Sequence, residues 1–120
     1  MSHATLWRAK LRDELLAARK NRDATRVSAL RCALSAIDNA EAVPALPDRL
    51  SRGAIANAVA GLGAAEAARR ELSDAEIREL LHGEIDERLA AARSVAATHP
   101  ERATTLHAEA AVLAGFLGDV

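Results

Sequence analysis

The residues with the clearest chemical potential are polar side chains at helical spacing in separate parts of the sequence. They are Arg31, Ser35, Asn39, Glu84, Arg88 and Glu109. Arginine binds carboxylates and phosphates in a bidentate geometry, so these residues could form a small polar groove for such an anion. The alternative is an interhelical network of ion pairs and hydrogen bonds that fixes the register of a bundle. We favour the network, because helices rich in alanine and leucine are otherwise under-specified.

The spacing of these residues supports either interpretation. Arg31, Ser35 and Asn39 stand four apart, so they form one polar line on a helix. Glu84 and Arg88 are an i,i+4 pair in the favourable order. Packing of the helices would bring the two glutamates of the set close to its two arginines. In a network, replacing Arg31 by alanine leaves a partner unpaired, which costs roughly 1–3 kcal/mol.

A second candidate site is basic. Arg22 and Arg26 follow a first helix that is dense in arginine and lysine, and together they could contact RNA phosphates without reading sequence. No aromatic residue is interleaved for base stacking, and no helix-turn-helix signature indicates DNA binding. We therefore favour a solvated basic face.

Motifs for catalysis or metal binding are missing from the sequence. His82 and Asp86 stand one helical turn apart, but a zinc site needs three or four converging ligands. There is no HExxH, CxxC, nucleophile elbow, Walker loop or dinucleotide fingerprint. We predict no catalytic residue, no metal site and no cofactor.

Composition indicates one all-α domain over residues 1–120. Half of the chain is hydrophobic, much of it alanine, and the only aromatic residues are Trp7 and Phe116. The formal net charge of −1 combines +5 over residues 1–31 with −6 over residues 71–120. The single cysteine, Cys32, fits a reducing cytoplasm and a half-buried position.

Apolar residues recur at helical spacing in four stretches. The second stretch is the clearest, with a single stripe made of Val27, Leu30, Leu34 and Ile37. We expect an antiparallel bundle of four long helices, because the connections are short. The expected helices cover about residues 5–20, 24–42, 74–97 and 100–117, with an irregular stretch over 43–72.

Helix caps can also be read from the sequence. Ser2 or Thr5 can cap the first helix, and Asp23 can cap the second. Ser73 and Glu76 form a capping box for the third.

The core face of the first helix follows from the same periodicity. Trp7, Leu11 and Leu15 lie on one side of it, and we expect Leu6 and Leu16 to widen that apolar face. No signal peptide or membrane span is present in the sequence, so we expect no membrane partner.

Several motifs together resemble the YqeY-like proteins of the GatB/YqeY family. The first helix ends in A-A-R-K-x-R-D, and R-x-S-A-L-R-x-A-L-S-A-I-x-N-A-E follows from Arg26 to Glu41. E-I-x-E-R-x-x-A-A runs from Glu84 to Ala92. A-E-A-A-V-L-x-x-F-L runs from Ala108 to Leu117. The match is to the N-terminal helical part of that family.

The resemblance implies a fold and two possible roles. In typical members the helical part is followed by a tail domain related to a subunit of the aspartyl/glutamyl-tRNA amidotransferase, and we expect that tail to be absent. The leading expectation is a small non-enzymatic interaction module with a protein partner, or one that self-associates. The alternative implied by the resemblance is a tRNA-associated accessory of that amidotransferase, a carbon–nitrogen ligase with glutamine as amido-N-donor.

Overall fold

The structure is a computed structural model that describes residues 2–42 and 70–119. Within these ranges the chain is helical and contains no strand, which confirms the all-α prediction. The helices are α1 (His3–Lys20), α2 (Ala24–Ala42), α5 (Asp74–Val95) and α6 (Pro100–Asp119). The third of these ends slightly before its predicted end at residue 97, and the last runs slightly beyond residue 117.

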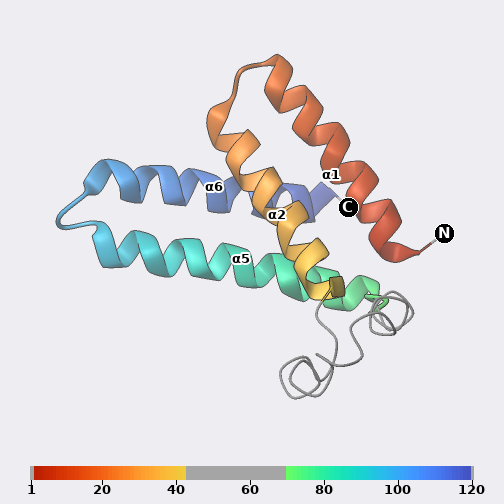
Figure 1. The fold of residues 1–120 in the computed structure, drawn as a ribbon. Helices are drawn as coiled ribbons and strands as arrows, with labels where there is room; N and C mark the ends of the chain where they lie inside the picture. The colour runs from red at the N-terminus through yellow and green to blue at the C-terminus, as the bar shows by residue number, and fades with distance from the viewer. Residues whose placement is uncertain (1, 43–69, 120) are drawn as a thin grey trace, which may run out of the picture.

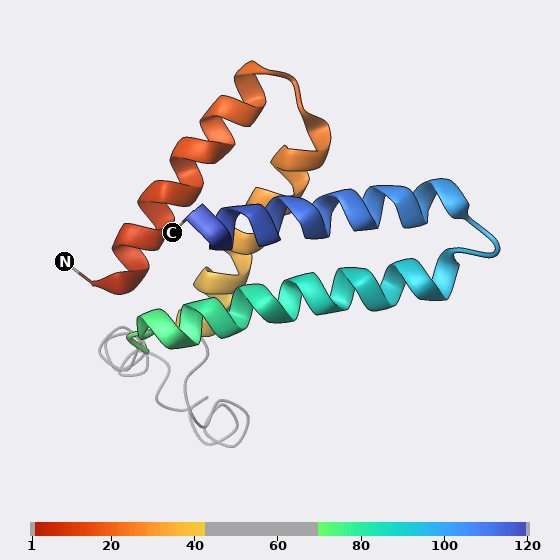
Figure 2. The ribbon, with the colours of Figure 1, turned by 180° about the vertical axis from the view of Figure 1, so that it is seen from behind.

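Two helical hairpins build the fold (Figure 1). Helices α1 and α2 are antiparallel across a short turn, and so are α5 and α6. The hairpins cross, so that α2 packs on both α5 and α6, and the C-terminal end of α6 lies beside α1. The view from behind shows that the turn between α5 and α6 extends well beyond the crossing (Figure 2). The predicted antiparallel bundle is therefore a pair of crossed hairpins.

Hydrophobic burial at the crossing holds the hairpins together. The predicted stripe positions Leu11 and Leu30 are fully buried, and so is Leu81 of α5. Ala29 and Ala33 of α2 are also fully buried, because their small side chains let neighbouring helices approach closely.

The prediction that Leu6 and Leu16 widen the buried apolar face of α1 is wrong. Leu6 is 47% exposed and Leu16 is 53% exposed. Both lie on the side of α1 that faces away from the second hairpin, so no helix covers them. A wider apolar face would need a further packed element, and none of the described helices supplies it.

The caps agree with the sequence. The Ser2 hydroxyl accepts a hydrogen bond from an amide of the first turn of α1. Asp23 Oδ1 accepts from the first turn of α2 at 3.1 Å. The Ser73 hydroxyl accepts from the Glu76 amide at 3.1 Å, while the Glu76 carboxylate accepts from the Ser73 amide at 3.0 Å. Helix boundaries here follow from local chemistry.

A cluster around Trp7 joins the starts of α1 and α5. Trp7 Nε1 donates to Asp74 Oδ1 at 2.9 Å. Arg78 Nε donates to Asp74 Oδ2 at 2.8 Å, and its guanidinium carbon lies 5.2 Å from the Trp7 ring centroid. The Trp7 ring also packs against Phe116, with ring centroids 5.8 Å apart. Hydrogen bonds from Arg78 and Trp7 lower the pKa of Asp74.

The predicted irregular stretch over 43–72 lies mostly outside the described residues. Residues 70–73 belong to no helix, and the Arg70 amide donates to the Glu41 carbonyl at 3.2 Å. None of the described helices is long and apolar enough to cross a membrane.

The lowered pKa of Asp74 predicts a pH-dependent stability. A carboxyl whose folded-state pKa is lowered stabilises the fold above its ordinary pKa of about 4, and this contribution is lost as the pH falls through the folded-state value. Asp74→Asn should therefore reduce the acid-induced loss of unfolding free energy below about pH 4, measured by urea denaturation at a series of pH values. Asp86→Asn, at an exposed position, is the control. Equal acid slopes for wild type and Asp74→Asn would contradict the prediction.

Candidate functional site: an arginine-lined groove on α2

A buried ion-pair triad links α5 to α6. Arg88 Nε donates to Glu109 Oε1 at 3.0 Å, and Arg88 Nη1 donates to Glu84 Oε1 at 3.0 Å. The side chains of Arg88 and Glu109 are only 10% and 8% exposed. Burial opposes the charged guanidinium, but hydrogen bonds to Glu84 and Glu109 outweigh burial and raise the pKa of Arg88. The expected approach of both glutamates to Arg88 is thus present.

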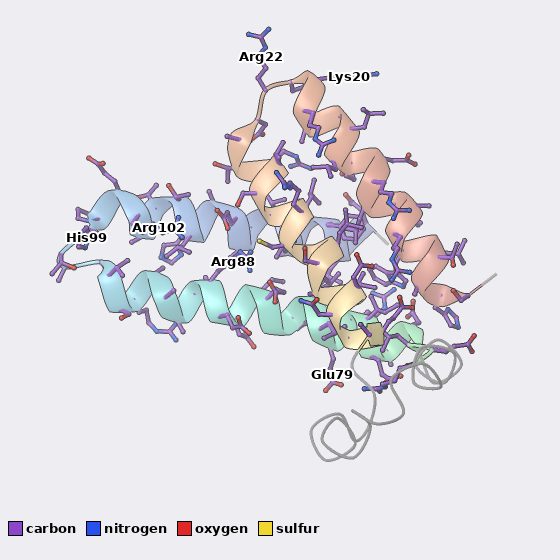
Figure 3. All side chains as sticks on the ribbon, in the orientation of Figure 1. Lys20, Arg22, Glu79, Arg88, His99 and Arg102 are labelled. Atoms are coloured by element: carbon purple, nitrogen blue, oxygen red, sulfur yellow. The ribbon has the colours of Figure 1, made fainter. Side chains whose placement is uncertain are left out.

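Helical spacing and packing produce the triad. Glu84 and Arg88 lie one turn apart on α5, and Arg88 Nη1 also donates to the Glu84 carbonyl at 3.1 Å. Glu109 comes from the facing side of α6. Cys32 of α2 is close enough to contribute to the raised pKa of Arg88, so the triad lies where α2 meets α5. Figure 3 shows Arg88 in this region between the helices.

Arg31 does not belong to this triad, contrary to the network interpretation. Its side chain is exposed, and it makes no ion pair or hydrogen bond with any other residue in 2–42 or 70–119. The physical reason is that Arg88 already pairs with Glu84 and Glu109, and it reaches them from their own hairpin.

An open groove of about 830 Å³ runs along α2. Its walls come from the end of α1, the turn after it, the exposed side of α2 and one residue of α5. The lining residues are Arg19, Arg22, Ala24, Val27, Ser28, Arg31, Cys32, Ser35, Ala36, Asn39 and Glu84. The cysteine is half-buried, as predicted.

The groove contains four of the six polar residues singled out from the sequence. Arg31, Ser35 and Asn39 form one line along it, and Glu84 closes one side. Of the other two members, Arg88 bonds to Glu84, and Glu109 of α6 bonds to Arg88.

Two polar residues of the groove, Arg19 and Ser28, were not singled out from the sequence. Arg19 stands in the last turn of α1, and Ser28 precedes Arg31 by one helical turn. Ser28 could have been found from the sequence, because it stands three positions before Arg31 and therefore on the same side of the helix. The contribution of Arg19 depends on how α1 and α2 pack, so the sequence pattern alone could not supply it.

The two residues of the predicted basic site, Arg22 and Arg26, have different surroundings in the structure. Arg26 Nη2 lies 3.3 Å from Glu14 Oε1, so Arg26 pairs α2 with α1. Arg22 makes no ion pair within the described residues and lines the groove. Its side chain extends outward from the turn (Figure 3).

Arg22 also has an unusual backbone. Its φ of 55° lies in the left-handed region, where glycine is favoured. The Asp23 amide donates to the Ala18 carbonyl at 2.9 Å, and the Arg22 amide donates to the Arg19 carbonyl at 3.1 Å. These are the two bonds of a Schellman motif. Asn21 is the C-cap of α1, and the left-handed residue is the next one, Arg22.

The groove has the chemistry of an anion-binding site. Arg19, Arg22 and Arg31 have no carboxylate partner in the part of the chain that the structure describes. Serine and asparagine side chains add neutral hydrogen-bond donors. The one carboxylate in the lining, Glu84, is engaged by Arg88. Over residues 2–42 and 70–119, no three metal-ligating side chains converge.

No protein-family model, curated protein or solved structure matches the chain. The resemblance to YqeY-like proteins stays a prediction.

Removing Arg88 should destabilise the protein strongly. Arg88→Met leaves the Glu109 carboxylate buried without its partner, which costs about 3 kcal/mol or more. Urea denaturation followed by circular dichroism measures this loss.

Two further variants test the cause. Arg88→Met combined with Glu109→Leu should recover much of the loss, because no buried charge is then left unpaired. Arg31→Ala should change the unfolding free energy by less than about 0.5 kcal/mol, as is usual for exposed residues. A loss from Arg31→Ala as large as that from Arg88→Met would place Arg31 in the network after all.

The left-handed backbone of Arg22 predicts that replacement by glycine has opposite effects on stability at Arg22 and at Arg19. Arg22→Gly should raise the unfolding free energy by about 1 kcal/mol, because glycine adopts positive φ without the steric cost. Arg19→Gly, inside the last turn of α1, should lower it by about 1 kcal/mol. Thermal or urea unfolding of both variants tests this, and a loss of stability in both would contradict it.

Proposed function

We propose that this protein is a non-enzymatic interaction module that binds an anionic surface of a partner in the α2 groove. One observation carries the proposal: Arg19, Arg22 and Arg31 line a single open groove, and none of them has a carboxylate partner among the described residues. The formal net charge of the chain is −1. Attraction of an anion is therefore a property of this local surface and not of the protein as a whole.

The side chains in the groove suit binding better than catalysis. Guanidinium, hydroxyl and amide groups hold an anion in place through hydrogen bonds. A general acid or base needs a titrating group with access to substrate. Glu84 is the only carboxylate in the lining, and its side chain is already engaged by Arg88.

The backbone of Arg22 supports the same view. A non-glycine residue at φ 55° costs about 1 kcal/mol. Strain of this kind is concentrated at functional sites. A glycine at this position would remove the strain and also the guanidinium, so the side chain has a use that outweighs the cost.

A second candidate is the RNA-associated accessory role that the resemblance implies. The turn that carries Lys20 and Arg22 projects from the molecule and suits contact with phosphates (Figure 3). Trp7 and Phe116, the only aromatic residues of the chain, are both buried against each other. An RNA complex would therefore rely on phosphate contacts without base stacking.

Charge reversal tests the anion-binding role. Labelled poly-glutamate and labelled bulk tRNA are titrated with the protein, and fluorescence anisotropy is read at low and near-physiological salt. Arg19→Glu with Arg31→Glu should weaken binding of the preferred polyanion at least about tenfold, since close charge pairs contribute more than about 1.4 kcal/mol. Saturable tRNA binding that survives the higher salt would favour the RNA role.

The matched control is Arg93→Glu with Arg102→Glu. Both residues are exposed, neither has an ion pair within the described residues, and the change in net charge is the same. Arg102 lies near the far turn of the second hairpin, well away from Arg22 (Figure 3). Equal loss of binding in both double variants would mean unspecific attraction and would refute the groove.

A further inference from the structure

We infer that the groove receives an acidic amphipathic helix from a protein partner. This inference rests on the proposed function and names the chemistry of the partner. It follows from the apolar residues of the groove, the spacing of its hydrogen-bond donors along α2 and the burial of the aromatic residues.

The lining of the groove is mixed. Val27, Cys32 and Ala36 line the groove beside Arg31, Ser35 and Asn39. Apolar lining gives no advantage to a phosphate backbone, which is charged along its whole length. An amphipathic helix buries its apolar side on such a surface and directs carboxylates to the flanking arginines.

The polar line of Arg31, Ser35 and Asn39 in the groove suits about two turns of a partner helix. Arg31 and Asn39, the two ends of this line, stand eight positions apart on α2, which spans about 12 Å. Partner carboxylates at i and i+7 or i+8 are separated by about 11–12 Å and match that interval.

A second copy of this chain does not fit the requirement. Glu79 and Asp86 of α5 are exposed and stand seven positions apart, so they have suitable charge and spacing. The apolar side of α5, however, is committed to its own core, where Ile77 and Leu81 are fully buried. It cannot supply apolar contacts to another molecule.

The positions of the charges also disfavour a closed dimer. Glu79 projects from the side of the molecule opposite the turn that carries Arg22 (Figure 3). A contact between these two surfaces is head-to-tail, which in general produces open chains unless the rotation closes into a ring. The helix in the groove is therefore assigned to a different protein.

RNA is disfavoured for a separate reason. Trp7 and Phe116 are buried and inaccessible, whereas single-stranded RNA is usually bound by stacking of bases on exposed aromatic rings.

A displayed library of helix-forming peptides, about five turns long and random in sequence, tests the inference on the full chain. Selection should enrich peptides with Asp or Glu at i and i+7 or i+8 and apolar residues on the adjoining side. Binding of the enriched peptides should weaken at least about tenfold on Arg31→Glu. Arg93→Glu should leave it within about twofold, because Arg93 lies outside the groove.

An exchange of charges between the peptide and Arg31 then determines the orientation of the peptide in the groove. Replacing one acidic position of an enriched peptide by arginine should restore part of its affinity for Arg31→Glu and weaken its affinity for wild type. The inference is overturned if no peptide is enriched, if enriched peptides lack the acidic pattern, or if Arg31→Glu binds them as wild type does.

Failure of the acidic-helix inference can be distinguished from failure of the proposed anion-binding function. Failure of the peptides together with groove-dependent binding of tRNA or poly-glutamate would reject the acidic helix and keep an anion-binding groove. Failure of every polyanion to respond to Arg19→Glu with Arg31→Glu would reject the groove itself.

Discussion

The rest of the structure depends on the pairing of Arg88 with Glu84 and Glu109. Glu109 is buried on α6, and a buried carboxylate without a partner would cost several kcal/mol. Arg88 supplies the counter-charge from α5 and makes a further bond to the backbone of its own helix. The two helices are thereby joined at the region that α2 packs against. The triad thus fixes the surface on which the first hairpin lies.

This pairing also determines what remains free. Because both glutamates are engaged, Arg31 has no acidic partner and stays on the exposed side of α2. Other arginines are used in the fold: Arg8 pairs with Asp38 and Glu41, which holds α1 to the end of α2. The described arginines therefore divide into those with an ion pair and those without one, and three of the latter share the groove. This division connects the stability of the fold to its proposed binding role.

Features that depend on neighbouring residues were predictable from the sequence, whereas features that depend on the crossing of the hairpins were not. The capping box at Ser73 and the apolar stripe of α2 are local patterns, and both are present. The exposure of Leu6 reflects which side of α1 faces the second hairpin. Arg31 and Arg88 stand on equally plausible helical faces, and only the packing shows that one is buried in a triad and the other lies in a groove. The left-handed backbone of Arg22 was hidden because the residue is not glycine.

The most direct test of this account is an NMR titration that observes the Nε–Hε groups of the arginine side chains while poly-glutamate is added. The account predicts that the Arg31 signal shifts with increasing poly-glutamate, while the signals of Arg88 and Arg93 stay in place. Arg88 is held by its ion pairs, and Arg93 lies outside the groove. Equal shifts at Arg31 and Arg93, or a joint shift of Arg31 and Arg88, would contradict the division between paired and groove arginines.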